Sequence, residues 1–281
     1  MVIDPNNVQN IIHREVFSDP SPGYFEDRIV RQFSAMLGLS DLADKDRDSL
    51  FELLIVMALK FAAIWTHDDR YAELEKRLIA KAGDNPIDRR QIDVPIKITT
   101  AQGLYIEFDG FLVQVKSVLD HMINILHYTL GLKFSGLSTF GGNGDTIIRQ
   151  LKNNVCAEPP IKRQVAQILV NHITINQGWL KGTIDTRDRM NHFMDGKLSP
   201  KSFAVALITD ADGNQRLHRP QISNAQTVKD LMHIILHSTL DFVEHFMGHA
   251  MSVRMPTVRI EYMEYDDLTK PRWFILPAEP F

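Results

Sequence analysis

Cysteine is almost absent from this sequence. Cys156 is the single cysteine among 281 residues, which excludes an intramolecular disulfide and a metal site built from several thiolates. Such a composition is typical of a reducing compartment, so we expect a cytoplasmic protein. Residues 1–10 are polar and include Asp4, unlike the basic and then apolar start of a secretory signal.

Long hydrophobic runs are also missing. The longest one covers residues 53–65 and contains Lys60, whereas a helix needs about 20 apolar residues to cross a bilayer. We interpret this run as a buried helix and expect no membrane partner.

The chain has no excess of positive charge. It carries 31 Lys and Arg against 35 Asp and Glu, a net charge of -4. This balance excludes a polycation that binds nucleic acid through bulk charge alone. The acidity belongs to residues 1–100, while residues 145–201 hold nine Lys and Arg against five Asp and Glu. Any contact with nucleic acid must therefore be local, and this basic stretch favours one.

Apolar residues recur every three or four positions along much of the chain, which is the pattern of amphipathic helices. The clearest series continues from Phe108 to Leu130 without a miss. Pro159 and Pro160 open another long helix that runs toward Gly182, with a further turn or two beyond it. The predicted helices cover residues 25–37, 49–65, 69–82, 104–130, 145–155, 159–182 and 227–251.

The extended segments lie late in the chain. Residues 203–208 and 215–219 flank a turn-forming run and predict a hairpin, and residues 258–265 and 272–276 predict two closing strands. The fold class is therefore mainly α, a helical bundle with a small β element near the C-terminus. We expect an N-terminal helical domain over residues 1–100, with a linker at about 84–103, and a second domain over 101–281.

One short motif points to chemistry. The run Arg187-Asp188-Arg189-Met190-Asn191-His192 places a polar residue after an arginine and a histidine five positions on. It resembles the signature of the HEPN superfamily. The resemblance implies a bundle of about four helices, with the motif at the end of the third long helix. It also implies a polar helix face turned toward the motif, for which Lys116, Ser117 and Asp120 are the candidates. The hairpin and closing strands are additions to that bundle.

The resemblance implies an endoribonuclease that needs no metal or cofactor, of a toxin or defence type. Arg187 would bind the phosphate and His192 would transfer a proton, supported by Asp188 and Asn191. On one straight helix, positions five apart point about 140° apart. The resemblance implies a homodimer, in which two arginines and two histidines line one cleft. RNA is then the substrate, and an antitoxin-like protein is a possible partner.

Two other readings stay open. The same dimer face could bind a nucleotide, a nucleic acid or a protein without catalysis, or Arg187 could be an ordinary surface residue paired with Asp185 and Asp188.

A separate series of polar residues recurs every four positions: His233, His237, Asp241, His245 and His249. Because each step drifts about 40° around a helix, only neighbours could share an ion. We interpret them as structural or solvated histidines, and a metal site at His237, Asp241 and His245 is a third possibility.

Overall fold

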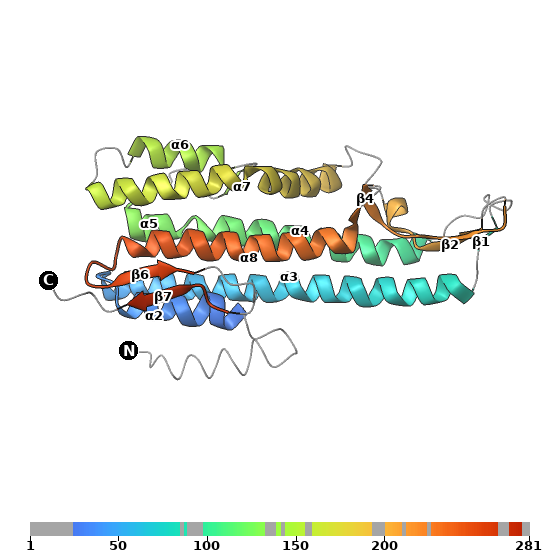
Figure 1. The fold of residues 1–281 in the computed structure, drawn as a ribbon, viewed down its shortest axis with the longest axis horizontal. Helices are drawn as coiled ribbons and strands as arrows, with labels where there is room; N and C mark the ends of the chain where they lie inside the picture. Colours follow the sequence, from blue (N-terminus) through green and yellow to red (C-terminus); the bar gives the residue numbers. More distant parts are fainter. Residues whose placement is uncertain are drawn as a thin grey trace. The chain divides into compact units, whose positions relative to one another are not determined.

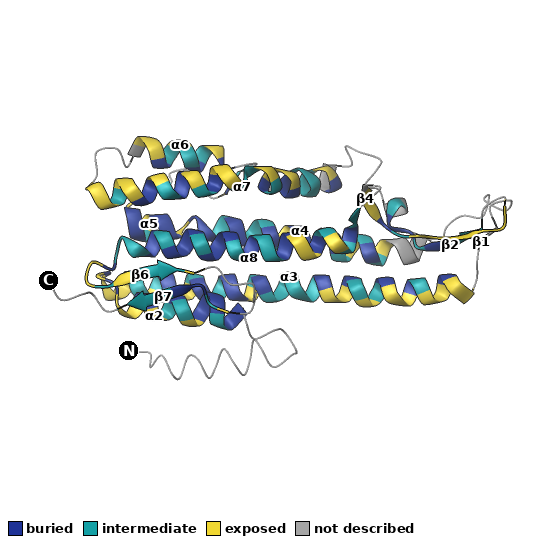
Figure 2. Ribbon diagram, viewed as in Figure 1, coloured by how far each residue is buried: buried dark blue, intermediate teal, exposed yellow. Residues whose placement is uncertain are grey.

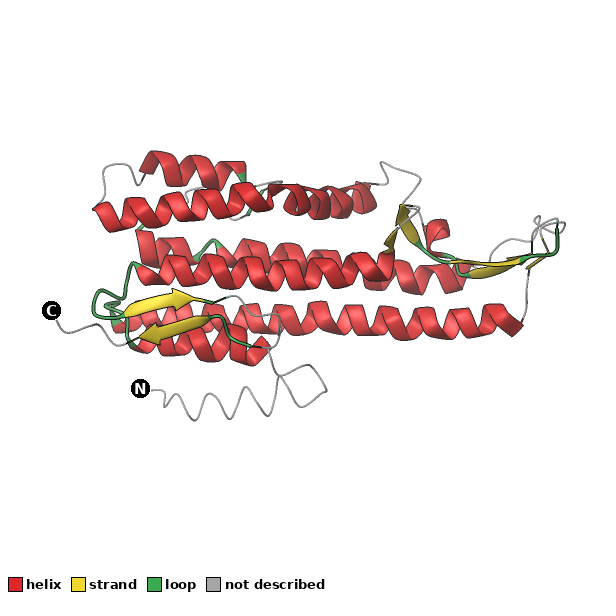
Figure 3. Cartoon of the chain, viewed as in Figure 1, coloured by secondary structure: helices red, strands yellow, loops and turns green. Residues whose placement is uncertain are grey.

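The computed structural model describes residues 25–84, 87–88, 98–132, 139–141, 144–154, 159–192, 200–209, 212–223, 226–263 and 270–276. Helices make up most of this part of the chain, and the described strands are short (Figure 1, Figure 3). The prediction of a mainly α chain with a small β element is confirmed.

The N-terminal helices are fewer and longer than predicted. A π-helical turn, η1 (Glu26–Arg31), leads directly into α2 (Gln32–Gly38), and one helix, α3 (Asp44–Asp84), follows. The prediction of separate helices over 49–65 and 69–82 is wrong. The polar residues between them interrupt the apolar pattern, but His67 and Asp68 find partners on other helices, Glu107 and Lys229. Tertiary contacts therefore keep the backbone helical there.

The next helices follow their predictions closely. The helix predicted over 104–130 begins earlier and has a break at residues 123–124, which divides it into α4 (Ile98–Met122) and α5 (Ile125–Leu130). Gly131 ends α5 in a left-handed conformation with φ of 74°, which glycine adopts at little cost. The predicted short helix is α6 (Asp145–Asn154).

The two remaining helices are long and continuous. The helix α7 (Pro160–His192) does not end near Gly182 but carries the whole 187–192 motif. The helix α8 (Val228–Ser252) confirms the last predicted helix.

The strands that the structure describes form three small sheets. The predicted hairpin is present as β2 (Ala206–Thr209) and β3 (Gln215–His218), antiparallel, after a 3₁₀ turn η4 (Pro200–Phe203). The two predicted closing strands pair antiparallel as β6 (Arg259–Tyr262) and β7 (Trp273–Leu276). Two pairings were not predicted. They are β1 (Ile87–Asp88), parallel to β2, and the pair β4 (Gln221–Ser223) and β5 (Gln226–Thr227).

The chain divides into two compact units. Unit 1 contains residues 1–62, 115–181 and 237–281, and unit 2 contains 63–114 and 182–236. Each unit thus takes residues from both sides of position 100, where we expected a domain boundary. Most of the predicted linker over 84–103 lies outside the described residues.

Each unit has its own buried apolar side chains, and buried positions recur along every long helix (Figure 2). In unit 1, Phe25 stacks on Phe61 with 5.7 Å between ring centroids. In unit 2, Phe203 packs against the rings of Tyr105 and Phe108. The long helix α3 is also long and apolar enough to cross a bilayer by length and composition, a property that buried helices share.

Candidate functional site

Arg187 stands on the inward face of α7 in unit 2. Its neighbours at helical spacing, Thr183, Ile184 and Met190, are buried. The Arg187 side chain is 34% exposed and its Nη1 donates to Asp188 Oδ1 at 2.9 Å. Its Nε is buried and has no hydrogen-bond partner within the described residues. A guanidinium group therefore lies among core residues of α7, and its Nε–H has no acceptor among the described residues.

Asp109 on α4 is a carboxylate from another helix that interacts electrostatically with Arg187. The pKa of its carboxyl group is raised because burial outweighs the opposing effects of the positive charges of Arg187 and His67. Its Oδ1 is buried without a hydrogen-bond partner in the described part of the chain. An incompletely paired carboxylate thus lies within electrostatic range of an incompletely paired guanidinium.

A histidine and a second carboxylate complete the set. His67 on α3 contacts Glu107 on α4, with 2.7 Å between Nδ1 and Oε2. Their side chains are 23% and 19% exposed. Gly110 allows this approach, because a β-carbon there would lie 2.5 Å from Cε1 of His67. The residue type at Gly110 therefore fixes how closely the imidazole can pack on α4.

Tyr105 ties α4 to the end of α7. Its hydroxyl donates to the carbonyl oxygen of Met190 at 3.2 Å. The pKa of Tyr105 is raised, first by burial and then by the charge of Asp109. This hydrogen bond holds the backbone three residues after Arg187. We call Arg187, Asp188, Asp109, His67, Glu107 and Tyr105 the Arg187 site.

The other predicted site residues are not described as part of it. Asn191 and His192 are the last two residues of α7, and their side chains lie outside the described residues. Ser117 and Asp120 belong to unit 1. Ser117 Oγ is 3.5 Å from His121 Nδ1, and Asp120 accepts the backbone N–H of Phe140 at 2.6 Å. The structure thus gives these two side chains local partners.

The sequence did carry a signal for Asp109. It lies seven residues before Lys116, two helical turns away, and therefore on the same stripe of α4 as the polar residues that were singled out. His67 and Glu107 had no comparable signal, because their pairing joins residues 40 positions apart.

Two histidines of the α8 series, His245 and His249, belong to a cluster of packed rings. The His245 ring is tilted against that of His172, with 4.1 Å between ring centroids, and meets that of His249 edge-on at 4.5 Å. Burial, followed by repulsion from a neighbouring imidazole, lowers the pKa of each of these three histidines to about 4. No group of three potential metal ligands occurs among the residues that the structure describes.

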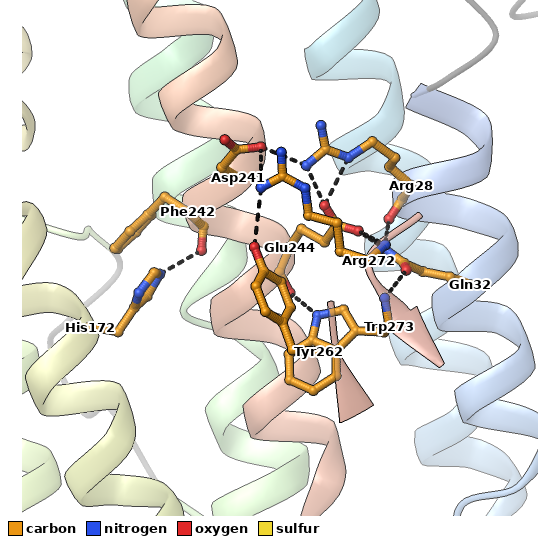
Figure 4. A network of polar contacts seen from close by, with 9 residues as sticks. All are labelled: Arg28, Gln32, His172, Asp241, Phe242, Glu244, Tyr262, Arg272 and Trp273. Carbon is orange, nitrogen blue, oxygen red and sulfur yellow. Dashed lines mark hydrogen bonds and ion pairs between the residues drawn. The ribbon is translucent and has the colours of Figure 1, made fainter. Parts of the chain in front are cut away.

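Asp241 and Glu244, also on α8, belong to a buried ionic network (Figure 4). Arg28 is fully buried and donates to Glu244 Oε2 through Nε at 2.8 Å and to Asp241 Oδ1 through Nη2 at 2.7 Å. Arg272 Nη1 contacts Asp241 at 3.1 Å and the Tyr262 hydroxyl at 3.1 Å. Two cations face two carboxylates, and the network joins η1, α8 and the β6–β7 hairpin. We interpret it as structural.

The Arg187 site therefore has the features expected of a functional centre: half-buried charges from three helices whose hydrogen-bonding capacity is only partly used. It offers a cation for an anionic group, an imidazole for proton exchange and carboxylates that orient both. Comparisons with protein-family models, with curated proteins and with solved structures gave no match.

Proposed function

We propose that this chain is a metal-independent endoribonuclease of HEPN type. Helices α4, α7 and α8 would supply the HEPN-like bundle, and the active site would form around the Arg187 site. Arg187 binds the scissile phosphate, and His192 takes part in proton transfer. Asp188 and Asn191 orient these two side chains.

The observation that carries this proposal is the environment of Arg187. Its side chain is half buried on the inward face of α7, and its Nε lacks a hydrogen-bond partner among the described residues. A buried donor without a partner costs about 1–3 kcal/mol. Such a cost is typical of a binding position that a ligand completes. A phosphate oxygen satisfies both the donor and the charge of a guanidinium.

Asp109 also contributes to the proposed active site. It is near enough for the charge of Arg187 to lower its pKa against the effect of burial. An acidic neighbour on a second helix restricts the orientations of the guanidinium, because the carboxylate attracts it. Asp109 is therefore a positioning residue for Arg187.

The assembly follows from the resemblance. A homodimer would bring two copies of the motif to one cleft, in a protein of toxin or defence type with an antitoxin-like partner. The reaction takes place without metal, since guanidinium stabilises phosphate charge and imidazole transfers protons.

Cleavage of RNA in excess chelator tests this function. The native protein should cleave single-stranded RNA, and Arg187→Ala and His192→Ala should each lower the rate by ~10² or more. Arg189→Ala is the matched control, because Arg189 lies on the same helix two residues later and is exposed. Its rate should stay within about twofold of the native rate, since exposed phosphate contacts contribute little individually.

The alternative is a binding module that holds a nucleotide or nucleic acid without cutting it. Binding of RNA that depends on Arg187, with no cleavage by the native dimer, would favour that alternative. Equal cleavage by the native protein and by both variants would refute the proposed mechanism.

A further inference from the structure

We propose that His67 and Glu107 form a proton-transfer pair of the Arg187 site, in which His67 is the general base. This inference rests on the proposed ribonuclease function and deepens it. The pair comes from α3 and α4, outside the 187–192 motif, so a single chain would contribute two histidines to one site.

The geometry of His67 is that of an oriented base. Nδ1 lies 2.7 Å from Glu107 Oε2, and Nε2 makes no hydrogen bond within the described residues. A carboxylate that accepts the Nδ1 proton selects the tautomer whose Nε2 has a free lone pair. It also stabilises the imidazolium that forms when Nε2 takes a proton. The imidazole is therefore held in the state that a base requires.

Helix α4 connects His67 with the helix that carries Arg187. Gly110 of α4 meets the His67 ring, and Tyr105, five residues earlier, donates to the carbonyl oxygen of Met190, three residues after Arg187 on α7. Glu107 Oε2 contacts His67 Nδ1, and the carboxyl group of Asp109, also on α4, lies within electrostatic range of His67. A phosphate held by Arg187 would consequently lie in the same part of unit 2 as the His67 ring.

The close approach of His67 to α4 requires glycine at position 110. The β-carbon of any other residue would meet Cε1 of His67 at 2.5 Å and Nε2 at 2.7 Å. Glycine also weakens a helix interior by about 1 kcal/mol relative to alanine. Gly110 in the middle of α4 thus lets the imidazole of His67 pack directly on the helix backbone.

Two proton transfers are needed to cut RNA by internal attack, and one motif histidine supplies only one per chain. His67 Nε2 would remove the proton from the 2′-hydroxyl as the 2′-oxygen forms its bond to phosphorus. The bond from phosphorus to the 5′-oxygen breaks, and the leaving oxygen receives a proton from a second acid. The products are a 2′,3′-cyclic phosphate and a 5′-hydroxyl, with no oxidant or metal consumed.

The experiment measures kcat, KM and the dependence of kcat on pH for RNA cleavage in chelator. His67→Gln should lower kcat by ~10² to 10³ with KM nearly unchanged, since a base acts in the transition state. The dependence of kcat on pH should change in His67→Gln, because the proposed base is absent. Glu107→Gln should give a smaller loss. Free imidazole should restore part of the activity of His67→Ala, which a merely structural residue would not allow.

A second variant tests the role of His67 without removing its side chain. Gly110→Ala keeps the imidazole but displaces it, and it should lower kcat with KM nearly unchanged. His127→Gln alters an exposed residue of α5 in unit 1; it is the matched control and should behave as the native protein. Thermal unfolding of every variant checks that the fold is retained.

The possible failures are distinguishable. If Arg187→Ala abolishes cleavage while His67→Gln keeps the native kcat and pH profile, this inference is overturned and the ribonuclease proposal stands. If the native protein does not cleave RNA at all, both are overturned. Loss of activity in His67→Ala without rescue by imidazole, in a folded variant, also overturns the role as base.

Discussion

Arg28 and Arg187 show how differently one type of side chain can be used. Arg28 has carboxylate partners on α8 for both Nε and Nη2. Arg187 retains a buried Nε without a partner among the described residues. A fully paired buried arginine contributes to the specificity of the fold, whereas a partly paired one can accept a ligand. The sequence indicated Arg187 through its motif, but it gave no signal for Arg28, whose partners lie more than 200 positions away.

Removing Arg28 should therefore destabilise the protein strongly. Arg28→Ala leaves the buried carboxylate of Glu244 uncompensated, and breaking such a pair costs ~3–5 kcal/mol. Arg28→Met combined with Glu244→Leu should recover much of that loss, because no unpaired charge remains. The free energy of unfolding in denaturant provides the comparison. Equal stability of Arg28→Ala and the native protein would contradict the structural role of the network.

At the scale of elements, periodic apolar residues predicted α6 and α8 well and found most of α4, α5 and α7, because burial of one face decides those helices. Alternation and a turn-forming run predicted the β2–β3 hairpin. The failures occurred where polar contacts decide the structure. The sequence divides α3 at Thr66, His67 and Asp68, and two of these residues are held by pairs to other helices. His67, one of the polar residues at which the sequence predicted a break in α3, also belongs to the Arg187 site. A local break in the apolar pattern thus coincides with a residue of the proposed site.

The contact between α7 and α8 in unit 1 should make the protein acid-sensitive. His172, His245 and His249 have pKa values lowered from 6.5 to about 4. The unfolded chain therefore binds more protons than the folded one between about pH 6.5 and pH 4. Stability should be complete above pH 6.5 and should fall as the pH drops through that window.

Urea unfolding at several pH values checks this dependence. His245→Phe keeps an aromatic ring in the cluster and removes one titrating group, so its stability should fall less steeply between pH 6.5 and pH 4. A native protein whose stability is flat across that window would contradict the argument. So would an equal change of slope in His127→Phe, which alters an exposed histidine on α5.

At the scale of the whole molecule, sequence composition predicted the class of fold but not its division. Charge and a proline-rich stretch suggested a boundary near residue 100, whereas both compact units combine early and late segments. The reason is that α3, α4, α7 and α8 each contribute one part to unit 1 and another to unit 2. Local composition cannot reveal which distant segments pack together.

Residues 1–100 expressed alone should consequently not form a stable domain. They contain Arg28, whose described carboxylate partners are Asp241 and Glu244 on α8, outside the fragment. We expect partial helix content in circular dichroism, without a cooperative unfolding transition. A sharp transition with well-dispersed amide resonances in the isolated fragment would show that the predicted N-terminal domain exists after all.

The parallel pairing of β1 with β2 has a consequence for the order of folding. Among the described residues, Ile87 pairs with Ile208 and Asp88 with Thr209, and this ladder closes a loop that contains α4, α5, α6 and α7. So short a ladder cannot offset the entropy of closing so long a loop. It must therefore form after the helices have brought its ends together, and it should be among the first hydrogen bonds to open and exchange with solvent.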